Sequence, residues 1–329
     1  TAITNDNNIS LIFTSSEIPI GFTTNSITVS NGQISNLEQS STDNKVYTAT
    51  FTPTGDGACT IRLLEGAYTD QGGNTNFPTG VFTWTHDGTP PHMIIVVRDP
   101  LGTTITQGVT TRYDILTVTF ASTKQFGNSS FSLSDDITIT NASLSNLLET
   151  SYSASYPAAF NSTLTTTNDG QVSIRVPPNS FQDIYGNTNT SDASLSWTLD
   201  KTAPGMNITS TTVTNGSYVN NLNAFTLNLV SSEATTSFAI GDISGSSGDI
   251  SASLSNFTKS TDRNYSVLFT PQNQGTTTLF VPAGAYTDAA GNNNSSSNQF
   301  LWTFDTTEPT MVITAKNSSN QDVSSGSIT

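Results

Sequence analysis

The sequence predicts an all-β protein built from tandem β-sandwiches, and three observations carry this prediction. Serine and threonine make up 102 of the 329 residues, whereas only 11% of the residues are charged. Short segments of alternating apolar and polar residues recur along the chain, and they are rich in the residue types that suit a half-buried pleated surface. One unit occurs three times, which is the mark of a repeat architecture.

The repeat is visible first around the three tryptophans. Trp84 and Trp197 are 113 positions apart, and Trp197 and Trp302 are 105 positions apart. In each copy a Trp-Thr pair is followed closely by an aspartate, a threonine and a proline. Upstream of each tryptophan lies an Asp-x-x-Gly-Asn loop, at residues 70–74, 183–187 and 288–292.

Each copy contains about seven short apolar segments separated by Gly, Asn, Ser and Asp, which favour turns. In the third copy these predicted strands are 206–208, 225–229, 242–243, 254–257, 265–269, 278–281 and 300–304. No stretch has the 3.6-residue period of an amphipathic helix. Seven short strands with one tryptophan predict a β-sandwich with that tryptophan in its core.

The spacing of the copies gives the domain boundaries. We expect one repeat at 1–90, a second at 91–204, a third at 205–309, and the first strand of a further repeat at 310–329. The linkers contain proline, which fixes φ, and they are short, so hinge motion is restricted. The expected shape is an elongated rod of sandwiches placed end to end.

The two motifs, Asp-x-x-Gly-Asn and Trp-Thr-x-Asp-x-Thr-x-Pro, resemble those of the bacterial-type Ig-like repeats found in long extracellular proteins and adhesins. The resemblance covers all three copies. It implies an Ig-like sandwich fold and a role as a spacer, stalk or fibre element. The middle copy departs most, since it has Lys124 where the others have Glu17 and Glu233.

The two ends of the chain are out of phase with the repeat. Residues 9–17 align with 225–233, the second strand of the third copy, so the first copy lacks its opening strand. Residues 311–314 match 206–209, an opening strand. Two interpretations fit. The chain is a window from a longer tandem array, or residues 310–329 of one subunit complete the open N-terminal sandwich of the next and so build a filament.

Composition excludes several classes of function. A net charge of −15 argues against nucleic acid and anionic membrane surfaces as partners, and no apolar run is long enough for direct membrane insertion. The single Cys59 excludes a disulfide framework, and we expect it to be buried and inert. No nucleophile, metalloprotease or phosphate-loop motif occurs, so we predict no catalytic residue and no enzyme activity. We expect His86 and His92, in the first linker, to be solvated.

Calcium at the domain junctions is the one cofactor that the sequence suggests, because loop and linker aspartates could supply hard oxygen ligands there. The candidate ligands are Asp70, Asp87, Asp183, Asp200, Asp288, Asp305, Glu17 and Glu233. The alternative is structural, since an aspartate in such a loop forms an Asx-turn and the Gly-Asn pair suits positive φ.

Twelve Asn-x-Ser/Thr sequences are candidate glycosylation sites. They are Asn8, Asn128, Asn141, Asn161, Asn189, Asn207, Asn215, Asn256, Asn264, Asn293, Asn294 and Asn317. With 32 asparagines and this content of serine and threonine, about ten such sequences occur by chance. The count is therefore no indication of a glycoprotein.

The function that the sequence predicts is structural: an extracellular or cell-surface fibre, stalk or appendage made of end-to-end Ig-like domains. Its expected partners are copies of itself, or further repeats of the same chain, placed head to tail. The alternative is an adhesin or a carbohydrate-binding array that uses loops at the domain ends to hold surface glycans.

Overall fold

The computed structural model describes residues 2–127, 131–132, 134–151, 153–220, 223–246, 253–324 and 326. Over these residues the chain is almost entirely strand and turn, with two single-turn 3-10 helices, η1 (Thr24–Ser26) and η2 (Ile240–Asp242). It divides into two compact units, Thr1–Asp200 and Lys201–Thr329. Within the described residues, no helix is long and apolar enough to span a membrane.

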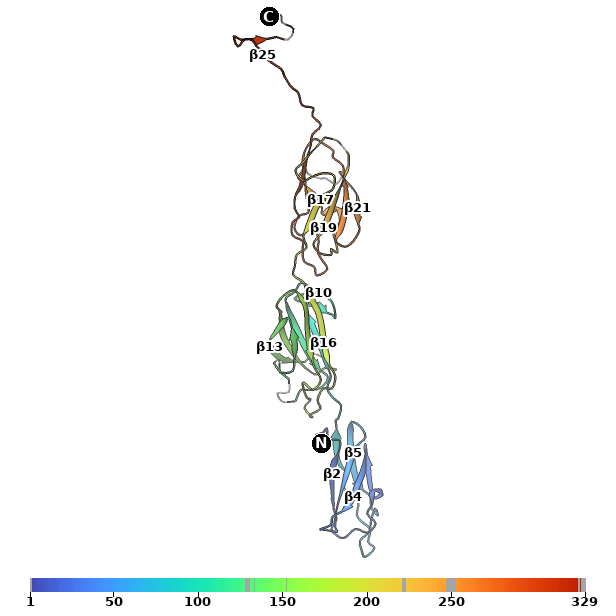
Figure 1. Cartoon of the computed structure of the whole chain (residues 1–329). Helices are drawn as coiled ribbons and strands as arrows, with labels where there is room; N and C mark the ends of the chain where they lie inside the picture. Colours follow the sequence, from blue (N-terminus) through green and yellow to red (C-terminus); the bar gives the residue numbers. More distant parts are fainter. Residues whose placement is uncertain are drawn as a thin grey trace. The chain divides into compact units, whose positions relative to one another are not determined.

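The first unit contains two sandwiches (Figure 1). In the first repeat, one sheet has the order β1-β7-β6-β3 and the facing sheet the order β2-β5-β4. These strands are β1 (Ile3–Thr4), β2 (Ile9–Thr14), β3 (Ile27–Ser30), β4 (Gly32–Gln39), β5 (Val46–Pro53), β6 (Gly57–Leu63) and β7 (Phe82–His86).

In the second repeat, one sheet has the order β10-β16-β15-β12 and the other the order β13-β14-β11-β8-β9. The strands are β8 (Met93–Arg98), β9 (Thr104–Ile105), β10 (Thr110–Thr111), β11 (Ile115–Ser122), β12 (Thr138–Thr140), β13 (Ala142–Thr150), β14 (Ala158–Thr166), β15 (Gly170–Val176) and β16 (Ala193–Leu199).

The second unit holds the third repeat, with the sheet orders β17-β19-β22-β21 and β18-β24-β23-β20. The strands are β17 (Met206–Ser210), β18 (Tyr218–Val219), β19 (Phe225–Ser231), β20 (Ser244–Gly245), β21 (Leu254–Lys259), β22 (Asn264–Phe269), β23 (Gly275–Phe280) and β24 (Phe300–Phe304). The predicted strand at 242–243 is wrong: helix η2 ends at Asp242, and the carboxylate of that residue accepts the Ala239 amide. A small hairpin follows, β25 (Ala315–Lys316) with β26 (Asp322–Val323).

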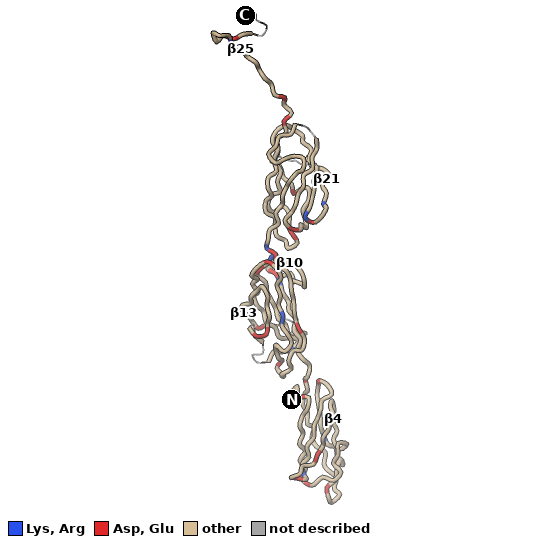
Figure 2. The backbone as a smooth tube through the Cα atoms, in the orientation of Figure 1, with Lys and Arg blue, Asp and Glu red and all other residues tan. Residues whose placement is uncertain are grey.

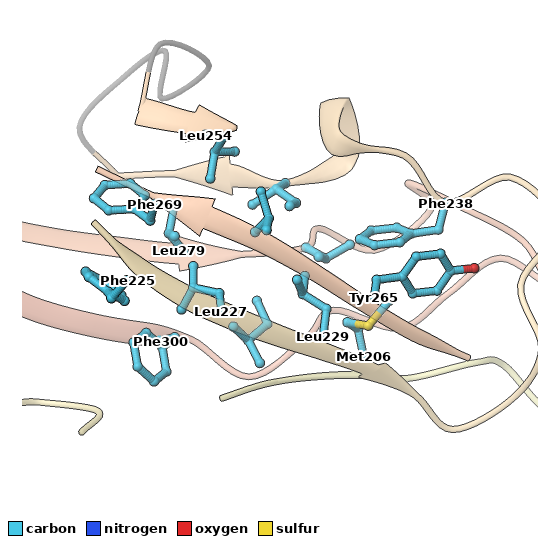
Figure 3. Packing of buried hydrophobic residues seen from close by; sticks show 14 of the residues in the cluster. Met206, Phe225, Leu227, Leu229, Phe238, Leu254, Tyr265, Phe269, Leu279 and Phe300 are labelled. Atoms are coloured by element: carbon cyan, nitrogen blue, oxygen red, sulfur yellow. The ribbon is translucent and has the colours of Figure 1, made fainter. Parts of the chain in front are cut away.

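Each tryptophan lies in the core of its repeat, as predicted, and is at most 4% exposed. The ring of Trp302 packs edge-on against Phe269, with centroids 4.6 Å apart, and Phe51 meets Trp84 in the same way at 4.7 Å. Alternating residues of both sheets fill the rest of the space, as Figure 3 shows for Phe225, Leu227 and Leu279 in the third repeat. Burial of these side chains is the main favourable term in the folding of each sandwich.

The three repeats differ in one sheet. Strand β17 pairs with β19 in the third repeat and β8 pairs with β11 in the second. Strand β2 is the equivalent of β19 and β11 in the first repeat. Among the described residues it pairs only with β5. Its other edge therefore carries backbone groups with no strand beside them, which is the usual site for adding a strand.

His86 is buried, at 5% exposed, so the prediction that it is solvated is wrong. The side chain continues the inward alternation of β7 after Trp84. Its positional equivalents are Leu199 and Phe304, both buried in their own cores. His92 is exposed, as predicted, and Cys59 is buried, also as predicted.

Candidate functional site

The three Asp-x-x-Gly-Asn loops have the same internal hydrogen bonds. In each loop, the backbone amide of the final asparagine donates to one carboxylate oxygen of the aspartate, at 2.8–2.9 Å, and the asparagine side chain donates to the other. The glycine before that asparagine has φ between 84° and 88° in all three, where a side chain would be strained. Each loop aspartate therefore already stabilises its own turn, whether or not it also binds a metal ion.

A second asparagine, two residues after each loop, was not predicted to have a structural role. Its side-chain oxygen accepts a backbone amide of the segment before the loop, and its amide group donates to two backbone carbonyls. These residues are Asn76, Asn189 and Asn294. The signal that could have found them is their recurrence at one position of the repeat.

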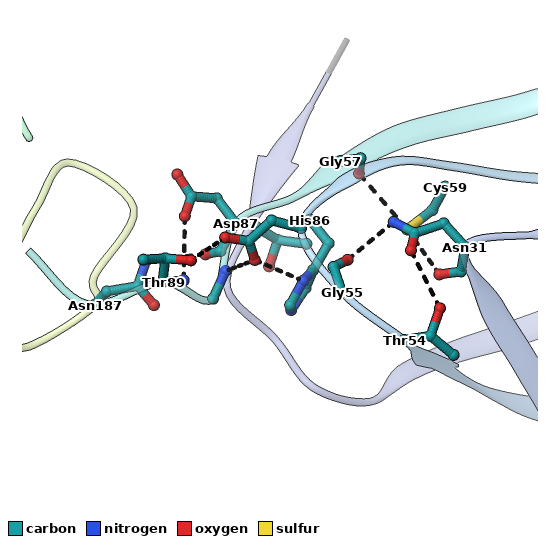
Figure 4. Close-up of polar contacts among 12 residues, drawn as sticks. Asn31, Thr54, Gly55, Gly57, Cys59, His86, Asp87, Thr89 and Asn187 are labelled. Atoms are coloured by element: carbon teal, nitrogen blue, oxygen red, sulfur yellow. Dashed lines mark hydrogen bonds and ion pairs between the residues drawn. The ribbon is translucent and has the colours of Figure 1, made fainter.

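Within the first unit, polar side chains meet where the first repeat ends and the second begins. The Lys124 ammonium donates to Asp87 Oδ1 and to the Thr89 carbonyl, and lies 3.3 Å from Asp183 Oδ2. Asn187, from the same loop as Asp183, donates to the Asp87 carbonyl at 2.9 Å. Of the predicted calcium ligands, this joint brings Asp87 and Asp183 together, with a lysine between them. Figure 4 shows Asp87, Thr89 and Asn187 at this joint.

The joint is anchored to the first repeat through Asp56. Its carboxylate accepts hydrogen bonds from the Thr89 hydroxyl and, at 2.7 Å, from the Gly88 amide. The bond from Thr89 contributes most, and together the two bonds hold the pKa of Asp56 below its ordinary value. Burial lowers the pKa of Lys124, but its bonds to Asp87 and Asp183 more than offset this, so that its pKa is raised. Lys124 is therefore charged, and the joint is an ion-pair network.

The first repeat also has an apolar groove beside the free edge of β2. The groove has a volume of about 380 Å³. It is lined by Ile9, Ser10, Leu11, Ile12, Phe13, Ile61, Arg62, Leu63, Thr79, Gly80 and Phe82. The inward residues Ile9, Leu11 and Phe13 are half-buried, whereas their equivalents on β11 and β19 are buried.

Comparison with protein families agrees with this architecture. The family model for the bacterial Ig-like domain matches residues 1–84 and 200–302, more than half of the chain. The chain belongs to the bacterial Ig-like domain family. The two matched segments include the first and third tryptophans and the two loops that resemble each other most. No curated protein sequence matches this bacterial Ig-like chain significantly.

Solved structures similar to this bacterial Ig-like chain include invasin, a bacterial integrin-binding protein, with 13% identity and a TM-score of 0.29 over 84% of this chain. The chain spans about half of the invasin structure, 51%. InvD of Yersinia pseudotuberculosis has 14% identity and a TM-score of 0.29, covering 90% of this chain and 88% of InvD. The C-terminal domain of the antigen I/II polypeptide BspA of Streptococcus agalactiae has 9% identity and a TM-score of 0.30, covering 65% of this chain and 100% of BspA's domain.

The other predicted calcium ligands of this bacterial Ig-like chain are distributed as follows. In the first repeat, Glu17 and Asp70 line one surface depression, and the bonds from Asn74 lower the pKa of Asp70. In the third repeat, carboxylate oxygens of Glu233 and Asp288 lie within 4.8 Å of each other, and Asp288 is buried. Asp200 and Asp305 are each the residue after a Trp-bearing strand, and Asp305 is exposed. Calcium binding stays a prediction.

The glycosylation candidates separate by burial. Asn189 and Asn294 are buried and are the loop asparagines described above, so a glycan on either would cost the folded protein those hydrogen bonds. Asn141 and Asn161 are half-buried, and Asn128 lies outside the described residues. The exposed candidates are Asn8, Asn207, Asn215, Asn256, Asn264, Asn293 and Asn317.

Proposed function

We propose that this chain is a structural component of an extracellular or cell-surface fibre, and that copies join when residues 311–315 of one chain add a strand to β2 of the next. The observation that carries the proposal is a pair of complementary features. The first repeat has an unpaired strand edge beside an apolar groove. Met311, Val312 and Ile313 are 85–88% exposed and have the sequence of an opening strand.

The register of the proposed pairing is taken from the corresponding strands of the other repeats. Met206 lies opposite Ser231 and Ile208 opposite Leu229. The equivalents of Ser231 and Leu229 in the first repeat are Ser15 and Phe13. In the proposed pairing Met311 is therefore opposite Ser15 and Ile313 opposite Phe13, with Val312 turned outward.

The same register appears in the second repeat. There Met93 lies opposite Ser122 and Ile95 opposite Phe120. Because a shift of one residue moves every side chain to the other face of the sheet, this register is the one that brings the apolar residues into the groove.

Disulfide trapping tests the register. Residues opposite each other in antiparallel strands lie close enough for a disulfide, and Cys59 is buried, so it does not interfere. We expect oxidised chains carrying both Ser15→Cys and Met311→Cys to form a ladder that reductant collapses. The matched control pairs Ser15→Cys with Val312→Cys, which lies out of register. Equal ladders from both pairs indicate random collision, and a monomer in both cases contradicts strand donation.

The mode of assembly can also be tested without cross-linking. Ile313→Asp places a charge in the groove and is expected to abolish assembly, whereas Val312→Asp, on the outward side, is expected to preserve it. Mass photometry of the two variants measures this difference. If neither variant assembles and the unmodified chain does not assemble either, the groove belongs to some other segment, such as an upstream repeat.

An adhesive or carbohydrate-binding role is the second candidate. The Asp183 loop is engaged in the joint through Lys124 and Asn187, which leaves it poorly available to a glycan. The depression between Glu17 and Asp70 is open. A glycan-array screen with the Asp70→Ala variant as control tests that surface, and binding that the variant loses would favour this second function.

A further inference from the structure

The joint between the first and second repeats contains an ammonium group where several oxygen ligands converge. Its acceptors are two carboxylates and one backbone carbonyl: Asp87 Oδ1, Asp183 Oδ2 and the Thr89 oxygen. These are the ligand types that calcium takes in proteins. We propose that the Lys124 ammonium takes the place of a bound metal ion at this joint, and that it restricts the motion of the first two repeats relative to each other.

Burial indicates that the charge is needed there. The Asp183 side chain is 0% exposed, and Lys124 and Asp87 are each 21% exposed. An aspartate buried to this extent requires a compensating charge or hydrogen bonds, since removal from water disfavours its ionised form. Asp183 has hydrogen bonds from its own loop, and Lys124 is the cation within reach of both Asp183 and Asp87.

The position of Lys124 in the repeat supports this assignment. Lys124 follows β11 at the place where Glu17 follows β2 and Glu233 follows β19. In the third repeat this position puts a carboxylate within 4.8 Å of the loop aspartate, Asp288. The second repeat presents an ammonium to the equivalent loop aspartate, Asp183, instead, so the chain itself supplies a positive charge at this position.

Lys124 also completes a set of contacts that hold the linker from both sides. On the side of the first repeat, the Thr4 carbonyl accepts the Asp87 amide and Asp56 accepts the Gly88 amide. On the side of the second repeat, Lys124 donates to Asp87 Oδ1 and to the Thr89 carbonyl, and Asn187 donates to the Asp87 carbonyl. Without the ammonium, the joint would keep the hydrogen bond from Asn187 to the Asp87 carbonyl but lose its ion pairs, and the two repeats would be expected to move more independently.

The test measures the spread of the distance between the two repeats. Spin labels on Thr28→Cys and Ser143→Cys, both exposed, report on the first and second repeats in the full-length chain. We expect a narrow distance distribution that EDTA leaves unchanged. Lys124→Met is expected to broaden it about two-fold. The control Lys259→Met removes a lysine that pairs with Asp262 in the second unit, and should leave the distribution unchanged.

A second variant tests whether the site is a cation site. Lys124→Glu, which restores the residue of the other repeats, is expected to broaden the distribution in EDTA and to narrow it again when calcium chloride is added. Circular dichroism of both variants should match that of the unmodified chain, which checks that they fold. Broadening of the unmodified joint by EDTA, or an unchanged width in Lys124→Met, would overturn the proposal. A Lys124→Glu joint that calcium does not narrow would show that the pocket does not act as a cation site.

Discussion

Phe82 is 62% exposed, whereas Phe300, at the same position of the third repeat, is 3% exposed. The two rings have the same relation to the neighbouring tryptophan: the centroids are 5.7 Å apart in the first repeat and 5.9 Å in the third, both with a 48° tilt. Strands β7 and β24, which carry these two residues, therefore place them in the same way against the core. The difference lies in the neighbouring sheet: β17 pairs with β19 in the third repeat, whereas β2, the equivalent of β19, pairs only with β5 among the described residues of the first repeat.

This pair gives the first prediction. Phe300→Ala should destabilise the second unit by about 3–5 kcal/mol, because it leaves a cavity in a closed core. Phe82→Ala should cost the monomeric chain less than about 1 kcal/mol, because water already reaches most of that ring. Chemical denaturation of the monomer measures both. Equal losses would show that the groove at Phe82 is already closed by another part of the chain.

The loop asparagines give a second prediction. Asn294→Ala removes the buried acceptor of the Tyr286 amide and the donor of two part-buried hydrogen bonds to the Pro282 and Ser295 carbonyls, so we expect a loss of about 2–4 kcal/mol in the stability of the second unit. The neighbouring Asn293→Ala is the matched control, since Asn293 is exposed, and should change stability by less than about 0.5 kcal/mol. Similar thermal shifts in the two variants would contradict the structural role of Asn294.

Much of the fold could be predicted from the sequence because the repeat supplies three independent copies of one pattern. The strand alternation, the core tryptophans and the loop turns all follow from residues that recur, such as Trp302 and Asp288. The burial of His86 could also have been predicted, since Leu199 and Phe304 hold its position in the other copies. Considered alone, a histidine in a linker gives no such indication.

The joint could not be predicted in the same way. Asp87, Lys124 and Asp183 are far apart in the sequence, and only the turn of the Asp183 loop and the end of β11 bring them together. Charged residues are few along the chain, as Figure 2 shows. In the sequence, Lys124 is only a position at which the second copy differs from the other two. From the sequence, Asn189 and Asn294 are only glycosylation candidates. The Asn-x-Ser/Thr pattern does not indicate whether the asparagine is exposed or buried and hydrogen-bonded inside a loop.

His86 gives a third prediction. Neither ring nitrogen has a hydrogen-bond partner among the described residues, and the nearest carboxylate oxygen, Asp56 Oδ1, is 3.5 Å from Nδ1. His86→Leu, which introduces the residue found at position 199, should therefore stabilise the first unit by about 1 kcal/mol, because an unsatisfied buried polar group is removed. Differential scanning calorimetry should show a rise of about 2–4 °C in its transition. A fall would mean that the contact with Asp56 contributes more than the burial of the imidazole costs. His92→Leu, at an exposed position, is the control.

Asp56 gives the last prediction, which concerns pH. The Thr89 hydroxyl and the Gly88 amide hold the pKa of Asp56 below its ordinary value of 3.8 in the folded chain. The unfolded chain therefore binds this proton more readily, so the carboxylate stabilises the fold above pH 3.8, and this contribution is lost as the pH falls through the lowered pKa. Asp56→Asn abolishes this dependence. The melting temperature of the unmodified chain, followed from about pH 5 to pH 2, should fall more steeply than that of the variant. Parallel profiles would contradict an ionised Asp56 carboxylate at the joint.

Hydrogen exchange gives a second measurement of the same contact. The backbone amides of Gly88 and Thr89 should exchange with deuterium faster in Asp56→Asn at neutral pH, because the contact between the linker and residue 56 is weakened.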